Sequence, residues 1–155
     1  MGVGMGENVR LNLGCGGQVL EGYIGVDIRP GVGQVTADLS KPWPFEDESV
    51  DEIRASHLVE HLPDALFTMS EAWRVLKRGG RFDIDVPSTN GMGAFQDPTH
   101  RSFWNVNSFL YYDRKNPLGE MYGCNRWEIV VAQEYNTKEM ASMGPFIKAI
   151  LRKPE

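Results

Sequence analysis

The feature that most constrains this chain is an apolar strand that runs straight into a glycine-rich turn, Arg10-Leu11-Asn12-Leu13-Gly14-Cys15-Gly16-Gly17. Glycine has no Cβ and reaches positive φ at little cost, so this turn lets the backbone bend sharply and approach a ligand closely. The strand begins near Val9 and the turn follows it without a break. The pattern predicts a ligand site at the carboxyl end of the first strand.

Two further apolar runs each end on an acid. Tyr23 to Val26 is followed by Asp27, and a run near Val35 to Ala37 is followed by Asp38. A glycine turn and two acids at the ends of successive strands is how an open α/β sheet holds a nucleoside. We therefore expect an α/β fold with these groups gathered at one edge of its sheet.

These motifs carry a family resemblance. Leu13-Gly14-Cys15-Gly16 followed by Gly25-Val26-Asp27 resembles the first two motifs of the class I S-adenosylmethionine-dependent methyltransferases. Three more stretches are similar to that family's later motifs. They are the adenine-side acidic motif (Ala37-Asp38-Leu39), the loop and fourth strand (44–53), and the helix end and turn before the fifth strand (71–80). All five motifs come in the family's order, over about residues 9 to 88.

The resemblance implies a Rossmann-like methyltransferase sheet, mostly parallel with an antiparallel C-terminal hairpin, in a single domain over residues 1–155. It implies S-adenosyl-L-methionine as the cofactor. The turn is expected to meet the methionine part of the cofactor, Asp27 the two ribose hydroxyls, Asp38 or the Leu39 backbone the adenine, and the end of the fourth strand the methionine end. The full set of expected cofactor-binding residues is Leu13, Gly14, Cys15, Gly16, Asp27, Ile28, Asp38, Leu39, Ser56 and His57.

A dinucleotide-binding domain is the competing interpretation. Its fingerprint has a third glycine where this chain has Val19, and its ribose acid follows about 20 residues later, whereas Asp27 comes only 13 residues after Gly14 (27 − 14 = 13). Both departures disfavour NAD. The same short spacing leaves no room for a helix over Gln18 to Gly22, and resembles a methyltransferase subgroup in which a loop replaces that helix. One wall of the cofactor cleft is then expected to be thin, or completed by another subunit of a homo-oligomer.

Composition and charge limit the kinds of partner that the protein is expected to bind. Residues 1–6 have neither the basic start nor the apolar core of a signal peptide, and no apolar run is long enough to span a bilayer, so we expect residues 1–8 to be disordered and no membrane contact. The net charge is −5, and eight acids against two bases between Asp38 and Asp64 disfavour nucleic acid. Two cysteines are too few for a disulfide framework, which favours the cytoplasm.

The segment His57-Leu58-Val59-Glu60-His61 has two histidines four residues apart, a spacing found in metal-binding helices. In the zinc-protease motif, however, Glu directly follows the first histidine, and Leu58 takes that place here. No third ligand is evident in the sequence. It therefore predicts no metal site; we expect His57 to line the methionine end of the cofactor and His61 to pack locally.

A helix is predicted from Pro63-Asp64 to about Leu76, ended by Gly79-Gly80. Arg81 to Val86 then alternates between charged and apolar residues, which indicates a fifth strand with one poorly covered face. Two last strands, Trp127 to Tyr135 and Phe146 to Leu151, fit the antiparallel hairpin.

Residues 88–127 hold half of the chain's aromatic residues and the flexible-looking segment Asn90-Gly91-Met92-Gly93. This stretch is interpreted equally as a substrate-side lid and as a second hydrophobic cluster over the open end of the sheet. Within it, His100 is the first candidate for a catalytic base, with Asp97 as its partner, because an unperturbed imidazole titrates near pH 6.5. The alternative is that the two residues anchor the loop through a structural hydrogen bond.

The sequence thus predicts methyl transfer to an oxygen or nitrogen nucleophile of a small molecule. A protein of a different class stays open beside it: a non-catalytic S-adenosylmethionine- or S-adenosylhomocysteine-binding protein, acting as a sensor or assembly subunit. The thin wall of the cofactor cleft and the compact lid are the features that favour it.

Overall fold

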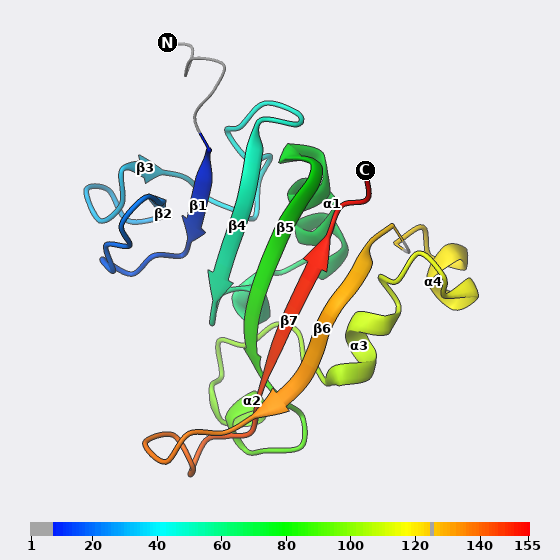
Figure 1. The fold of residues 1–155 in the computed structure, drawn as a ribbon. Coiled ribbons are helices and arrows are strands. Elements are labelled where there is room, and N and C mark those ends of the chain that lie inside the picture. The colour runs from blue at the N-terminus through cyan, green and yellow to red at the C-terminus, as the bar shows by residue number, and fades with distance from the viewer. Residues whose placement is uncertain (1–7, 125) are drawn as a thin grey trace.

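The computed structural model describes residues 8–124 and 126–155, and a seven-stranded sheet forms its centre (Figure 1). The strand order is β3-β2-β1-β4-β5-β7-β6. The strands are β1 (Arg10–Leu13), β2 (Ile24–Asp27), β3 (Val35–Thr36), β4 (Val50–Ser56), β5 (Leu76–Pro87), β6 (Glu128–Tyr135) and β7 (Phe146–Arg152). The expected disordered segment, residues 1–8, lies outside the described residues except for its last position.

Strands β1 to β5 pair in parallel, whereas β7 pairs antiparallel with both β5 and β6. This confirms the predicted sheet. Parallel neighbours bring the carboxyl ends of β1, β2 and β4 to one edge, with Leu13 level with Val26 on one side and with Ala55 on the other. The apolar side chains of β1 and β4 form part of the core, and Leu11, Leu13 and Ile53 are almost fully buried.

The connection between β1 and β2 contains turns and no helix, as its length predicted. Val19, in the middle of this loop, is 86% exposed. The cofactor edge of the sheet is therefore bordered by loops on the β1–β2 side.

The main helix, α1 (Ala65–Val75), begins where the sequence placed it. The Asp64 side chain accepts a hydrogen bond from the Phe67 backbone N at 2.9 Å, which satisfies a free donor of the first turn. The predicted end, about Leu76, is correct to within a residue, because α1 stops at Val75 and Leu76 is already extended. The glycine pair, however, does not end the helix, and β5 starts at Leu76 rather than at the predicted Arg81. Gly79 and Gly80 lie inside β5 instead, where pairing with β4 shifts register, and Gly79 reaches the φ of +75° that this irregularity requires.

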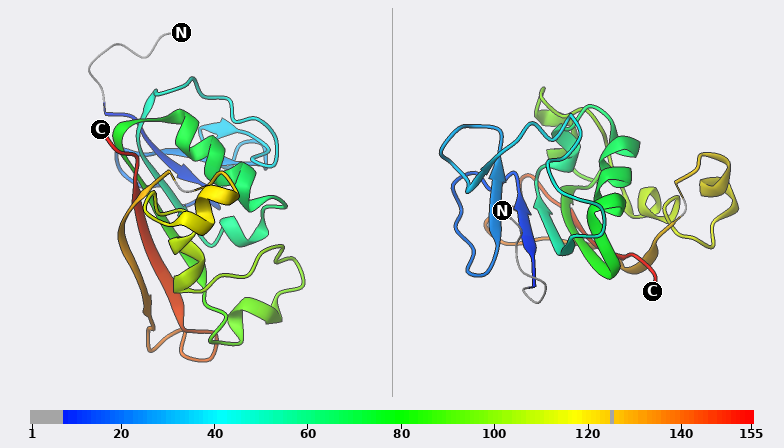
Figure 2. Two further views of the ribbon diagram at one scale, coloured as in Figure 1. Left: turned by 90° about the vertical axis from the view of Figure 1, so that its right-hand side faces the viewer. Right: turned by 90° about the horizontal axis from the view of Figure 1, so that it is seen from above.

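Four short helices complete the fold: η1 (Val59–His61), α2 (Gly93–Gln96), α3 (Val106–Leu110) and α4 (Pro117–Met121). The α-helices lie on one face of the sheet (Figure 2, left). That face carries the core: Phe82, Ile84 and Ile147 are fully buried, and Trp127 packs against both Phe82 and Trp73.

The opposite face of the sheet is polar, and no helix of the described residues covers it (Figure 2). Lys148 of β7 pairs with both Asp83 and Asp85 of β5, and Tyr135 of β6 donates to Asp85 Oδ1 at 2.7 Å. Burial acts to lower the pKa of Lys148, but its bonds to the two carboxylates outweigh this and raise it. The charged pattern of β5 thus marks an uncovered face on which ion pairs replace an apolar layer.

Candidate functional site

The glycine turn has the backbone shape that its composition predicted. Gly14 and Gly16 have φ of +61° and +57°, a region that other residues rarely adopt. A Cβ at Gly14 would lie 2.9 Å from Leu58 Cδ1, so the turn at the end of β1 packs directly on the segment after β4. A Cβ at Gly16 would meet only the Gly14 carbonyl oxygen, at 3.9 Å, so the space beside it is available to a ligand.

Asp27 at the end of β2 faces this turn. It is 6% exposed, and its Oδ2 accepts a hydrogen bond from the Gly16 backbone N at 2.9 Å. Arg29, which the sequence did not single out, donates to Oδ1 from its backbone N and from Nε, each at 3.0 Å. The Arg29 guanidinium and these backbone donors outweigh burial and lower the pKa of Asp27 to about 2. The carboxylate is therefore ionised at any physiological pH.

The remaining turn residues contribute backbone rather than side chains. Leu13 is 1% exposed and belongs to the core. The Cys15 thiol is buried within close reach of Gly25 and Gly33, where a Cβ would meet it at 3.0 and 3.1 Å. The Cys15 side chain therefore fills space inside the protein, and only its backbone faces the turn.

The residues expected at the adenine side lie at the ends of β2 and β3. Ile28 is 62% exposed, which leaves an apolar side chain free beside Asp27. The Asp38 carboxylate accepts from the Ser40 backbone N and hydroxyl, and these bonds lower its pKa. Leu39 is buried, and its carbonyl accepts from the Trp43 indole at 3.0 Å. Asp38 and Leu39 thus shape a turn, with one Asp38 oxygen 3.6 Å from Lys41.

At the end of β4, Ser56 is followed by a change in backbone direction. His57 has φ of +53°, and its backbone N donates to the Asp85 carbonyl at 2.9 Å. Its ring stands edge-on to Phe146, and its Nδ1 lies 3.7 Å from Glu60 Oε1. The interaction with Glu60 raises the pKa of His57.

The structure brings the predicted catalytic residues next to this segment. The His100 ring lies 4.7 Å from the His61 ring, centroid to centroid, and its side chain is only 5% exposed. His100 Nε2 is 3.7 Å from Asp97 Oδ2, while Asp97 Oδ1 accepts from the Thr99 backbone N and hydroxyl. We call His57, Glu60, His61 and His100 the histidine cluster; it contains all three histidines of the chain.

Residues 88–127 divide into two parts. Trp104, Phe109 and Tyr112 are buried and stacked in the core, whereas Phe95 and Phe103 stack on each other and are 60% and 50% exposed. Gly91 and Gly93 lie against the β6–β7 connection, where a Cβ on either would collide with the carbonyl oxygens of Gly144 and Met143. Close backbone approach thus accounts for these two glycines, which the sequence suggested as a hinge.

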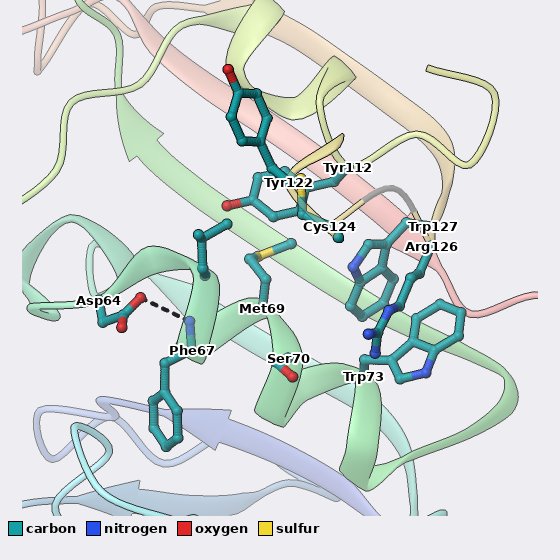
Figure 3. Close-up of a pocket in the computed structure, with 12 residues that line it drawn as sticks. Asp64, Phe67, Met69, Ser70, Trp73, Tyr112, Tyr122, Cys124, Arg126 and Trp127 are labelled. Carbon is teal, nitrogen blue, oxygen red and sulfur yellow. Dashed lines mark hydrogen bonds between the residues drawn. The ribbon is translucent and has the colours of Figure 1, made fainter. Parts of the chain in front are cut away.

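A cleft of about 310 Å³ lies away from these residues, between α1 and residues 112–127 (Figure 3). Met69 and Trp73 of α1 lie opposite Tyr112, Cys124 and Trp127 in this view. Leu66 of α1 also lines the cleft, and it is 52% exposed. None of the expected cofactor residues lines this cleft, so we assign it no part in the chemistry.

No helix in the described ranges, 8–124 and 126–155, has the length and apolar character needed to cross a bilayer.

The cofactor edge and the histidine cluster together form the candidate site. A glycine turn and a buried carboxylate lie on one side, and Leu58 joins them to a group of imidazoles and carboxylates on the other.

Comparison with known proteins agrees with this geometry. A family model described as "Methyltransferase domain" matches residues 1–84 of the 155. No curated protein matches the sequence.

Solved methyltransferase structures share the fold at low sequence identity. A Haloferax volcanii methyltransferase in complex with the Trm112 methyltransferase activator has a TM-score of 0.72 at 14% identity, over 96% of this chain and 84% of that chain. An S-adenosylmethionine-dependent methyltransferase from Archaeoglobus fulgidus gives 0.66 at 19% identity, over 96% and 87%. The methyltransferase CalH, in complex with S-adenosylhomocysteine, gives 0.67 at 16% identity, over 94% and 51%.

The predicted sheet, the motif order and the matching family model agree on one cofactor, S-adenosylmethionine. The NAD interpretation is thereby set aside. This chain belongs to the methyltransferase-domain family of the class I S-adenosylmethionine-dependent methyltransferases.

Proposed function

We propose that this protein transfers the methyl group of S-adenosylmethionine to an oxygen or nitrogen nucleophile of a small molecule. The observation that carries the proposal is the direct packing of Leu58 on Gly14, which joins the cofactor turn to a polar cluster of three imidazoles and a buried carboxylate. A cluster of this kind, beside a cofactor that donates a methyl cation, suits an acceptor that loses a proton. The net charge of −5 argues against a polyanionic acceptor.

The residues at the cofactor edge fit the group. Positive φ at Gly14 and Gly16 and the open space beside Gly16 permit close backbone approach. The ionised Asp27 is suited to accept hydrogen bonds from two ribose hydroxyls. Arg29 now occupies Oδ1, but its side chain is 62% exposed and free to swing away. Ile28, Asp38 and Leu39 would border the adenine, and Ser56 and His57 the methionine end.

When bound, S-adenosylmethionine supplies a methyl group on a sulfonium, which an acceptor lone pair displaces in line. The chain's own contribution is to hold the two reactants and to accept the acceptor's proton. His100 Nδ1 must donate to the Ala94 carbonyl at 2.8 Å, because a carbonyl only accepts, so neutral His100 presents its Nε2 lone pair. This nitrogen is the proposed proton acceptor, with Asp97 as its partner.

A second function is favoured by two observations. The wall of the cofactor edge carries exposed apolar side chains, Val19 at 86% and Ile28 at 62%, and one similar structure is a methyltransferase in complex with its activator. A non-catalytic cofactor-binding subunit, or an enzyme completed by a partner protein or a second copy of this chain, would show these features.

The free thiols of Cys15 and Cys124 fit action in the cytoplasm.

One experiment separates these functions. Calorimetry with S-adenosylhomocysteine and with NAD tests the cofactor, and a panel of small phenols, carboxylic acids and amines with methyl-labelled S-adenosylmethionine tests transfer. We expect stoichiometric binding of S-adenosylhomocysteine, none of NAD, and label in at least one small-molecule product. Binding without transfer to any compound, for the protein alone, would favour the non-catalytic subunit.

A further inference from the structure

We propose that Glu60, His61 and His100 form a binding site for a divalent transition-metal ion of the zinc type. One ligand atom from each residue lies within 4.8 Å of the others. The three residues come from two segments: η1, directly after the end of β4, and the loop after α2. The sequence argued against a metal because it showed no third ligand near His57 and His61; the fold supplies one in His100.

The tautomers of both imidazoles are fixed in the form that a metal needs. His100 Nδ1 donates to the Ala94 carbonyl, which leaves a lone pair on Nε2. His61 Nδ1 lies 3.0 Å from the Thr99 hydroxyl, whose own proton goes to Asp97 Oδ1 at 2.7 Å. The hydroxyl therefore accepts from His61, and His61 Nε2 also keeps its lone pair. Metal-binding histidines are held in this way by partners on the other ring nitrogen.

Glu60 is the least exposed member of the site. Its side chain is 2% exposed, and Oε2 is buried without a hydrogen-bond partner among the described residues. A buried carboxylate oxygen without a partner is costly, and a bound cation offsets that cost. The Glu60 carbonyl accepts from the backbone N of Arg101 at 2.6 Å and of Ser102 at 3.2 Å, which holds the His100 loop against η1.

The donor set selects the class of ion. Two imidazole nitrogens and one carboxylate suit zinc and its first-row neighbours, whereas magnesium and calcium prefer oxygen ligands alone. Ligand atoms about 2.1 Å from a tetrahedral ion lie roughly 3.4 Å apart. His61 Nε2 is 4.0 Å from Glu60 Oε1, so small side-chain rotations suffice, and the His61 side chain is 33% exposed and free to make them.

Charged groups next to Glu60 offer an alternative to a metal ion for balancing its negative charge. His57 Nδ1 is 3.7 Å from Glu60 Oε1, so a protonated His57 could neutralise the carboxylate in place of a metal. Asp97 Oδ2, 3.7 Å from His100 Nε2, adds a second negative charge on the other side. The two carboxylates, Glu60 and Asp97, carry two negative charges, one more than a protonated His57 balances, which favours a divalent ion.

The role of this ion rests on the proposed function. Three protein ligands leave a fourth position for an acceptor oxygen, and a metal there lowers the pKa of that oxygen and orients it. His100 would then be a ligand rather than the proton acceptor, and the proton of the acceptor oxygen would pass to solvent water when that oxygen binds the ion. The site itself is tested without any methyl transfer.

The experiment uses the full, untagged chain, stripped with EDTA and dialysed, and titrated with Zn²⁺ in competition with a chromophoric chelator. Co²⁺ is the second probe, since its visible absorption reports nitrogen and oxygen coordination. We expect one ion per chain, and at least a tenfold loss of affinity in each of Glu60→Gln, His61→Ala and His100→Ala. Cys124→Ser is the control for adventitious binding to a thiol and should leave the affinity unchanged.

Binding of S-adenosylhomocysteine by each variant shows that it is folded. The proposal is overturned if the wild type binds neither Zn²⁺ nor Co²⁺ stoichiometrically, or if Cys124→Ser weakens binding and the three ligand variants do not. Either result, with S-adenosylhomocysteine binding intact, removes the metal site and leaves the methyltransferase proposal standing.

Discussion

The two halves of the candidate site are made in different ways. The centre of the cofactor half comes from one strand–turn–strand unit, residues 10–29, and consists of backbone shape plus the Asp27 carboxylate, with Asp38 and the end of β4 on either side of it. The acceptor half consists of side chains, and it joins η1 to a loop whose Thr99 is 38 residues from its partner His61. Only the centre of the cofactor half is local in the sequence.

This difference has a chemical reason. Every member of the family must hold the same cofactor, and a backbone turn does this with few side-chain requirements. The acceptor differs between enzymes, so the groups that meet it have to be side chains on loops. Leu58 connects the halves, since it follows His57 and packs on Gly14. The following predictions test whether the two halves are energetically separate.

The largest effect is expected for Asp27→Ala. Loss of charge-assisted bonds to two ribose hydroxyls should weaken S-adenosylhomocysteine binding by roughly 2 to 4 kcal/mol, measured by calorimetry. Asp113→Ala is the matched control, because Asp113 likewise accepts from a backbone N two residues later but lies on the surface of another segment. Unchanged affinity in folded Asp27→Ala would show that another residue holds the ribose. Zinc affinity should not change in either variant.

Gly14→Ala tests the connection between the halves. Gly14 and Gly31 both have positive φ, +61° and +76°, but a Cβ meets Leu58 at Gly14 and nothing within 4 Å at Gly31. Gly31→Ala should lower the free energy of unfolding by about 1 kcal/mol, and Gly14→Ala by about 2 to 3 kcal/mol, because overpacking adds to the φ cost. Urea denaturation measures both. Equal losses would mean that Leu58 yields freely and that the halves are not coupled.

A smaller effect concerns acid stability. The pKa of Asp27 is about 2 in the folded protein, against about 3.9 when unfolded, so its contribution is present above pH 3.9 and is lost as pH falls toward 2. Removing the main cause in Arg29→Ala should raise the folded pKa and shrink this loss by about 1 kcal/mol. Urea midpoints at pH 5, 4, 3 and 2.5 test it. Curves that stay parallel for wild type and variant would exclude Arg29 as the cause.

Local chemistry explains how much of the fold was predictable. Strand ends were correct to within a residue or two wherever an apolar run met an acid or a proline, and Asp64 marked the start of α1. The end of α1 was correct to within a residue, but the start of β5 at Leu76 was not predicted, because Gly79 serves equally well to end a helix or to let a strand bulge. Its backbone N donates to the Lys153 carbonyl at 2.8 Å, a contact made by the far end of the chain.

The same limit applies to the site. The glycine turn and Asp27 could be predicted because their contacts are local. Glu60 could not, since its burial and its distance to His100 depend on the packing of two loops. Gly91 and Gly93 suggested a hinge, yet the structure gives them close contacts with residues 143 and 144. A sequence shows that a glycine is needed, but not whether for freedom or for space.

The smallest expected effect is in residues 91–104, which belong to the stretch 88–127 interpreted from the sequence as a substrate-side lid or a second hydrophobic cluster. In the structure, this segment has two parts. Residues 99–104 are held by the bonds of Arg101 and Ser102 to the Glu60 carbonyl and by Thr89 N to the Trp104 carbonyl at 2.8 Å. Residues 92–98 carry the exposed side chains, Met92 at 70% and Phe95 at 60%. Hydrogen exchange should therefore find 99–104 protected with or without ligand.

In residues 95–98 we expect fast exchange in the free protein, slowed by about three- to tenfold when S-adenosylhomocysteine binds, because these residues are largely exposed, whereas Gly93 and Ala94 before them are buried. Residues 106–110 of α3 are the internal control, since Phe109 is fully buried and their exchange should not respond. Ligand-dependent protection across the whole of 91–104 would mean that the histidine cluster itself opens with this segment. His100 and Glu60 would then not be preassembled, and the acceptor half would form only after the cofactor half is filled.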